Sequence, residues 1–340
     1  MAKLSKTYNI LIRSAILVFT FYFLYKQLFF KHDLSSFFDN LETVTREKHF
    51  VVLLLFVVLL MPANLLLESR KWQFLMQKME AVSLWEAVKA VLAGISVSVF
   101  LPNRVGDYLG RVFVLKKADR IQATLATILG SMAQLLTTLL FGLVSFAFFL
   151  LRWINLNSAL NQWALSGLVF STVLAMAVLV FSYLNFAVFS EVIRRVSGRV
   201  YNKIARYAEV FSWYDIKELL FVLFISILRY LVFSLQFYVL LRIFRVQVDY
   251  LHAMMVIGLI YLLMSIIPTI ALSEIGVRGS VSLYVFGLFF GGTATELLMR
   301  HIVAASSALW LLNLALPAVL GILFIFRLRF FRNNRNHVVD

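Results

Sequence analysis

The sequence has no cysteine and few charged residues, and these shortages limit what the chain can be. Of its 340 residues, 14% are charged, against about 25% in soluble domains, while 62% are hydrophobic. The absence of cysteine excludes disulfides and thiolate chemistry. The five histidines are scattered without metal-ligand spacing, and no nucleotide-binding or nucleophile-elbow motif occurs. We therefore expect a membrane protein that is not an enzyme and has no metal or cofactor.

Long apolar runs predict an all-α polytopic membrane protein, because about 20 consecutive apolar residues cross a bilayer as a helix. We predict eight transmembrane helices, at 10–30, 50–67, 121–150, 164–188, 218–241, 252–268, 273–290 and 301–326. The apolar run at 90–101 is too short to cross, and a run of that length is typical of a re-entrant segment.

The basic residues predict the orientation of these helices. The chain carries a formal charge of +15, and 22 of its 32 Lys and Arg residues lie in alternate connecting segments and the two termini. Only eight lie in the segments between them. The positive-inside rule then places both termini in the cytoplasm, provided that 90–101 dips in and returns. Cations in short loops fix topology and contact lipid headgroups, so nucleic acid is not an expected partner.

We expect one integral membrane domain, 1–326, followed by a basic cytoplasmic tail, 327–340. The segment 191–217 has apolar residues at spacings of three and four and arginines and lysines between them. That pattern predicts a basic amphipathic helix lying on anionic lipid headgroups. A solvated linker that helps to set orientation is the alternative.

The stretch "SVFLPNRVGDYLGRVFVLKKADR", 98–120, places charges directly behind an apolar run. Asp107 and Arg111 are four residues apart and share a face of a helix that begins near Asn103, with Arg104 one turn earlier. A helix N-terminus beside two arginines suits a phosphate headgroup. The alternative is an interfacial helix in which Asp107 and Arg111 pair with each other.

The stretch "SIIPTIALSEIGVRGSVSLYVF", 265–286, follows a similar plan: apolar run, proline, then glycine, an acid and an arginine. Glu274 and Arg278 are its charged residues. Interrupted hydrophobic segments in corresponding halves are typical of transport sites built from broken helices. The two stretches therefore indicate a loose two-half repeat, unless they are two ordinary interhelical loops that are similar by chance.

Arg229 lies near the middle of the predicted span 218–241, where an arginine must face a partner or water. Its expected partner is Glu274, with Asp107 second; alternatively, its side chain reaches the membrane interface. The segment "ESRKWQFLMQ", 68–77, has the composition of an interfacial anchor.

Three motifs together resemble the flippase-like membrane domain of the lysylphosphatidylglycerol synthase family: "SRKW", "LPNRVGDYLGRVFVL" and "IPTIALSEIGVRGS". Gly106-Asp107 stands where Gly-Glu is usual in that family, and Arg111 takes the arginine position. Glu274 precedes Gly276, whereas many relatives place the acid after the glycine. The resemblance implies a bundle of re-entrant or broken helices around a cavity, which in the synthase is associated with moving an aminoacylated phospholipid between leaflets. We expect no aminoacyl-transferase domain, because only a short polar segment follows the last span.

The leading hypothesis is a lipid translocase or headgroup-binding protein of a bacterial inner membrane. Its substrate would be an anionic or aminoacylated phospholipid or a lipid-linked intermediate. Arg104, Arg111 and Arg278 would hold the phosphate, Asp107 and Glu274 would orient them or contact a cationic headgroup, and Arg229 would pair with a buried acid. A non-transporting accessory protein that binds a lipid-linked intermediate or a membrane partner is the alternative. A membrane transferase is a weaker one, since it needs a metal and a paired acidic motif.

Overall fold

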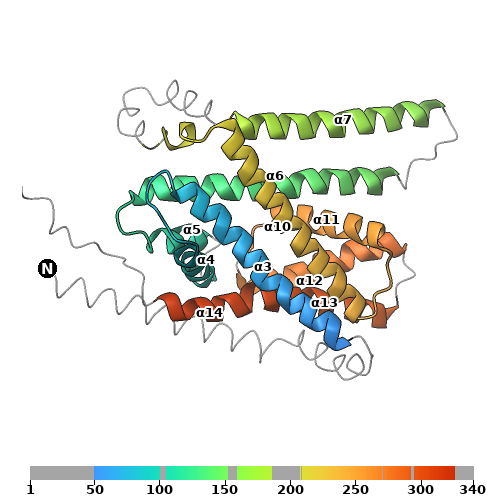
Figure 1. Ribbon diagram of the computed structural model, residues 1–340. Helices are drawn as coiled ribbons and strands as arrows, with labels where there is room; N and C mark the ends of the chain where they lie inside the picture. Colours follow the sequence, from blue (N-terminus) through green and yellow to red (C-terminus); the bar gives the residue numbers. More distant parts are fainter. Residues whose placement is uncertain are drawn as a thin grey trace, which may run out of the picture.

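The computed structural model describes residues 50–99, 105–151, 159–185, 207, 209–269, 271–291 and 295–325, which form helices and contain no strand. The helices are α3 (Phe50–Met76), α4 (Leu84–Ser98), α5 (Val105–Val112), α6 (Arg120–Leu151), α7 (Ala159–Leu184), η4 (Glu209–Ser212), α10 (Ile216–Ile243), α11 (Tyr250–Ile266), α12 (Ala271–Phe290), α13 (Glu296–Trp310), a π-helical turn η5 (Leu311–Ala315) and α14 (Leu316–Ile325). Helices α6 and α7 run side by side, while α3 and α10 cross the bundle together (Figure 1).

Seven of the eight predicted spans coincide with helices, and the first, 10–30, lies outside the described residues. Five helices are long and apolar enough to cross a membrane: Phe50–Met76, Arg120–Leu151, Trp163–Leu184, Ile216–Ile243 and Glu296–Phe324. The chain is thus a multi-pass integral membrane protein. The count of eight crossings and the cytoplasmic termini stay predictions. The basic tail and most of the predicted surface helix at 191–217 also lie outside the described residues.

Helix α3 is longer than predicted. It continues from the apolar run through Met76, and Lys71 and Trp72 are buried rather than interfacial. Within 68–77, the exposed residues are Arg70 and Gln77. The interfacial-anchor prediction for 68–77 is therefore wrong. The polar groups are accommodated because each finds a contact inside the bundle: Trp72 Nε1 donates to Thr127 Oγ1 at 3.0 Å, and Lys71 pairs with Glu68.

Helix α4 begins at a capping box, in which Ser83 and Glu86 satisfy each other's backbone N–H groups. Its 15 residues extend about 22 Å, less than the ~30 Å hydrocarbon core of a bilayer. Helix α5 packs closely against it: a Cβ on Gly110 would lie 2.6 Å from the Cα of Gly94. Only glycines allow two helices to approach this closely, so α4 and α5 are held together at their backbones.

Helix α11 ends near the middle of α6. Gly142 of α6 lies against Leu262 of α11, and Ser145 lies against Gly258, so the two helices are antiparallel. Ile266, the last residue of α11, lines the same cavity as Thr138, in the middle of α6. The α4–α5 and α11–α12 pairs lie toward opposite ends of the bundle (Figure 1).

The hydrophobic interior is divided into two large clusters that share the same long helices. One cluster contains the first half of α3, the second half of α10 and much of α11–α13. The other contains the end of α3, the start of α10, the first part of α6 and α4. Between the two clusters, α3 carries Asn64 and Glu68, and α10 carries Ser226 and Arg229. The polar residues thus form a belt at mid-length of the bundle.

Candidate functional site

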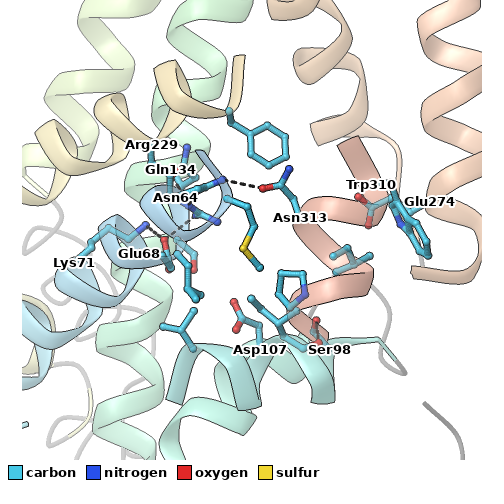
Figure 2. A pocket seen from close by; sticks show the side chains of 18 of the residues that line it. Asn64, Glu68, Lys71, Ser98, Asp107, Gln134, Arg229, Glu274, Trp310 and Asn313 are labelled. Atoms are coloured by element: carbon cyan, nitrogen blue, oxygen red, sulfur yellow. Dashed lines mark hydrogen bonds and ion pairs between the residues drawn. The ribbon is translucent and has the colours of Figure 1, made fainter. Parts of the chain in front are cut away.

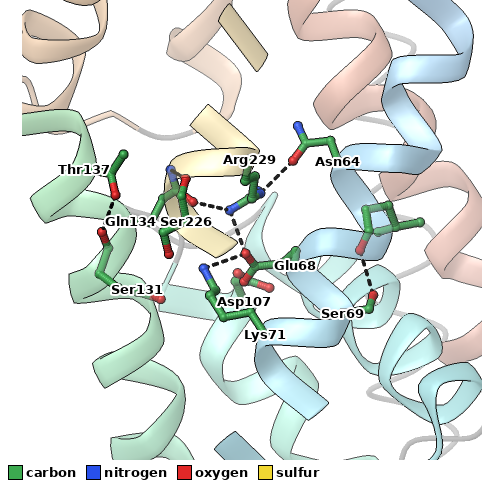
Figure 3. A network of polar contacts seen from close by, with 12 residues as sticks. Asn64, Glu68, Ser69, Lys71, Asp107, Ser131, Gln134, Thr137, Ser226 and Arg229 are labelled. Atoms are coloured by element: carbon green, nitrogen blue, oxygen red, sulfur yellow. Dashed lines mark hydrogen bonds and ion pairs between the residues drawn. The ribbon is translucent and has the colours of Figure 1, made fainter. Parts of the chain in front are cut away.

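Glu68 is the centre of the belt, and its carboxylate contacts three cations. Oε1 accepts a hydrogen bond from Arg111 Nη1 at 2.6 Å, and Oε2 accepts one from Arg229 Nη1 at 2.7 Å. Lys71 Nζ lies 2.8 Å from Oε2. Glu68 is 4% exposed, and Lys71 and Arg111 are as deeply buried. Figure 3 shows the contacts of Lys71 and Arg229 with Glu68. A buried charge is tolerated only when it is paired, so this carboxylate is what allows three cations to share the interior.

Arg229 joins three helices. Besides Glu68 on α3, its Nε donates to Asn64 Oδ1 at 2.7 Å, and its Nη1 lies 3.4 Å from Gln134 Oε1 on α6 (Figure 3). The expectation that Arg229 pairs with Glu274 or Asp107 is wrong, and so is the alternative that it reaches the interface. The reason is that α10 packs along α3, which carries Glu68 to the arginine, while Glu274 and Asp107 pair on their own helices.

The α5 pair forms as its spacing predicts. Arg111 Nε donates to Asp107 Oδ1 at 2.8 Å, and a second contact joins Nη2 to Oδ2. The pair is not interfacial, because Arg111 is 4% exposed and extends on to Glu68. Gly94 makes room for it: a Cβ there would lie 2.5 Å from Asp107 Oδ1. Arg104 lies outside the described residues.

The α12 pair resembles the α5 pair. Arg278 Nη2 donates to Glu274 Oε1 at 2.8 Å, again between residues four apart near the start of a helix. Both side chains are buried. Among the described residues, the Nε and Nη1 groups of Arg278 find no hydrogen-bond partner. This arginine, which lines the cavity described next, therefore has hydrogen-bonding capacity that Glu274 does not fill.

These side chains line one cavity of about 270 Å³. Figure 2 shows Lys71, Glu68 and Arg229 on one side of it and Glu274 on the other, with Asp107 between the two sides and lower in the view. The charged residues that line it are Glu68, Lys71, Asp107, Arg111, Arg229, Glu274 and Arg278. The described part of the 103–111 element, 105–111, therefore converges with 273–278, which their sequence could not establish. That these residues bind a substrate stays a prediction.

A second cavity of about 510 Å³ adjoins the first. The two have a common wall that includes Arg229, Glu274 and Arg278. The second extends to the exposed turn that follows α11, where Pro268 and Thr269 line it. Together the cavities reach from the α4–α5 pair, through the charged belt, to the α11–α12 turn.

A chain of amides continues the belt toward the π-helical turn. Asn64 Nδ2 lies 3.4 Å from Asn313 Oδ1, Asn313 Nδ2 donates to Gln236 Oε1 at 2.7 Å, and Gln236 Nε2 donates to Val57 O at 2.9 Å. Pro317 follows this turn and has no N–H to donate to the carbonyl of Asn313, which favours a local departure from α-helical geometry.

Several site residues were not identified from the sequence, notably Glu68, Lys71 and Asn64. A signal was present: the three occur at spacings of four and three, which puts them on one face of α3. The positive-inside rule already explains basic residues at the end of an apolar run, so this periodicity alone does not identify a buried site. Gln134 and Asn313 stand alone in apolar runs and have no comparable signal.

The family model described as the lysylphosphatidylglycerol synthase TM region matches residues 10–316 of the chain. The match covers all the helices that line the charged cavity as far as the π-helical turn. No significant match was found among curated proteins or among solved structures.

Proposed function

The chain belongs to the family of the lysylphosphatidylglycerol synthase TM region, and we propose that it moves a lipid headgroup across the membrane. The substrate class is an anionic or aminoacylated phospholipid or a lipid-linked intermediate. The observation that carries the proposal is the cavity lined by seven charged side chains between two apolar clusters. The chain would act as a transporter, without catalysis or a cofactor.

The free-energy cost of burying the charged side chains of the belt supports a functional role for them. Charged side chains inside a bilayer are expensive, and bundles retain them chiefly along substrate or ion pathways. A packed apolar interior would serve stability as well or better, since replacing buried ion pairs with apolar residues is often neutral or stabilising. A lipid that changes leaflets needs a polar route for its headgroup while its chains stay in the hydrocarbon. The two adjoining cavities supply such a route.

The arrangement of short helices supports the same role. We propose that α4–α5 and α11–α12 are broken or re-entrant pairs that enter from opposite sides of the membrane. Both α5 and α12 begin near the charged belt and carry an acid followed four residues later by an arginine. Helix N-termini directed at a central site are typical of transporters with inverted repeats. The loose repeat at 98–120 and 265–286 fits this arrangement.

The protein would work in a bacterial inner membrane with both termini in the cytoplasm, as the distribution of basic residues favours. Residues 1–326 would form one membrane domain. The segment 191–217 would contact anionic headgroups, because its positive charge is attracted to the cytoplasmic leaflet.

Replacing Arg278 with Gln should reduce leaflet exchange at least tenfold. The variant removes a cavity charge that is paired only through Nη2, so the arginine is needed for the substrate more than for Glu274. The measurement is the exchange of a fluorescent phospholipid in proteoliposomes, followed by quenching from outside. Arg300 offers a matched control, because it pairs with Glu296 at the same spacing but is 62% exposed.

Arg300→Gln should exchange lipid at the wild-type rate. Wild-type exchange by a folded Arg278→Gln would remove Arg278 from the site. If the wild-type protein retains labelled lipid in detergent but shows no exchange in liposomes, the chain binds lipid without transporting it, as an accessory protein would.

A further inference from the structure

The charges that line the cavity do not balance. Lys71, Arg111, Arg229 and Arg278 give four positive charges, whereas Glu68, Asp107 and Glu274 give three negative ones. Each carboxylate contacts an arginine, which favours its ionised form, and arginine keeps its proton in proteins. Lys71 contacts the Glu68 carboxylate, which favours the charged form of the lysine. Among the described residues, the cavity therefore carries one net positive charge. In a low-dielectric surrounding, that charge favours a ligand with one negative charge.

We propose that the cavity selects a phosphodiester headgroup that has one net negative charge and no amine of its own. This proposal rests on the proposed function and narrows its substrate class. It disfavours an aminoacylated headgroup, whose amines make the headgroup neutral or positive.

Two cations that line the cavity have hydrogen-bonding capacity that the described residues do not fill. Arg278 has its Nε and Nη1 unpartnered, and Lys71 Nζ, although 2.8 Å from Glu68, has no well-aligned hydrogen bond. Arg278 is 7% exposed and Lys71 is 2% exposed, so water in bulk does not satisfy them. They come from α12 and α3, and Figure 2 shows Lys71 of α3 and Glu274, the α12 partner of Arg278, on opposite sides of the cavity. One phosphodiester has two unesterified oxygens, so it can accept from both sides.

The acids of the cavity are committed to its own cations. Glu68 contacts three of them, and both oxygens of Asp107 face Arg111. A ligand ammonium would have to compete with arginines already held by charge-assisted hydrogen bonds, and it would add a positive charge to a cavity that has one in excess. The charge distribution of the cavity thus opposes a cationic headgroup in two ways: its acids already contact cations, and its net charge is already positive.

A lipid suits the surroundings of the cavity better than a soluble phosphate ester does. Leu135 of α6 lines the charged cavity and also an apolar groove of about 160 Å³ between α6 and α7. Leucines of both helices line that groove. An alkyl chain attached to the bound phosphate would find this apolar surface directly beside it.

The test compares tracer lipids that differ in headgroup charge, in proteoliposomes of one composition. We expect phosphatidylglycerol to exchange at least about tenfold faster than phosphatidylethanolamine and lysylphosphatidylglycerol, which add no net negative charge. Soluble glycerophosphoglycerol in excess should inhibit only weakly, since it lacks the chains. Inhibition as strong as that by the lipid would show that the site takes the phosphate ester alone.

Lys71→Met is the most informative variant, because it removes the excess charge while keeping an unbranched side chain of similar length. The ratio of phosphatidylglycerol to phosphatidylethanolamine exchange should fall several-fold. Lys71→Arg, which keeps the charge, should retain the preference and shows whether the position tolerates change. Lys116→Met removes a lysine that is 61% exposed and should leave the ratio unchanged.

The outcomes separate the two proposals. Equal exchange of all three lipids by the wild-type protein would overturn the charge selection and leave lipid transport standing. Faster exchange of lysylphosphatidylglycerol would overturn it as well. A wild-type protein that exchanges none of them would overturn the proposed function itself. An unchanged lipid ratio in a folded Lys71→Met variant would show that the excess charge does not set the preference.

Discussion

Replacing Glu68 with Gln should lower the free energy of unfolding by about 3–5 kcal/mol, the cost of removing one partner from a buried ion pair. The substitution keeps the shape of the side chain, removes its charge and turns one of its two acceptor oxygens into a donor. Lys71, Arg111 and Arg229 then face one another without the carboxylate that they share, although each has a nitrogen within 2.8 Å of one of its oxygens. Denaturant titration of the purified protein in detergent micelles would measure the loss.

Glu296 provides the matched control for this prediction. It too is paired with an arginine, Arg300, at 2.6 Å, but its side chain is 81% exposed. Exposed ion pairs contribute little, so Glu296→Gln should unfold at the same denaturant concentration as the wild type. Equal stability of Glu68→Gln and Glu296→Gln would mean that the three cations do not depend on Glu68, and the description of the belt would have to be abandoned.

The helices were largely predictable from the sequence, because long apolar runs in a bilayer have few alternatives to the helix. Which face of each helix is buried and which is exposed was not predictable. In α3, Val51, Val52 and Leu55 are exposed while Val57 is buried, and all four are equally apolar. In a membrane protein the lipid-facing and the core-facing sides have the same chemistry, so the periodicity that identifies the buried face of a soluble helix is missing.

The charged site was predictable only in part, and the difference lies in sequence separation. The Asp107–Arg111 pair follows from a spacing of four on one helix, and Arg229 stands out because its neighbours are apolar. The contact of Arg229 with Glu68 joins residues 161 positions apart. It depends on α3 and α10 being neighbours, which no local pattern specifies. The predicted partner, Glu274, is the most conspicuous acid in the apolar part of the sequence, but it pairs with Arg278 of its own helix.

The two hydrophobic clusters explain why the charged belt lies where it does. Along α3, the residues of one cluster end at Val57 and those of the other begin at Leu65, and Asn64 and Glu68 lie near the zone where they meet. A ligand bound in the belt would therefore lie between the two clusters and would not have to displace either of them.

Replacing Gly94 with Ala should destabilise the protein by about 1–3 kcal/mol, the usual cost of forcing an extra group into a packed interior. The added Cβ would lie 2.5 Å from Asp107 Oδ1, 2.8 Å from its backbone oxygen and 2.9 Å from Arg111 Cγ. Because one of these atoms belongs to the backbone of α5, rotation of a side chain cannot relieve the clash. Helix α5 has to move away from α4, and Asp107 and Arg111 move with it.

The rate of leaflet exchange by Gly94→Ala should therefore fall more than the loss of stability alone explains, because Arg111 also moves away from Glu68. Gly287 of α12 is the matched control: a Cβ there would meet nothing within 4 Å. Gly287→Ala should be as stable as the wild type or up to ~1 kcal/mol more stable, because alanine is the better helix former. Thermal unfolding in detergent and exchange in liposomes, measured on both variants, test the packing and the site together. If Gly94→Ala unfolds like Gly287→Ala and exchanges lipid at the wild-type rate, α4 and α5 do not pack closely at Gly94, and the α5 pair is not held in the cavity by that contact.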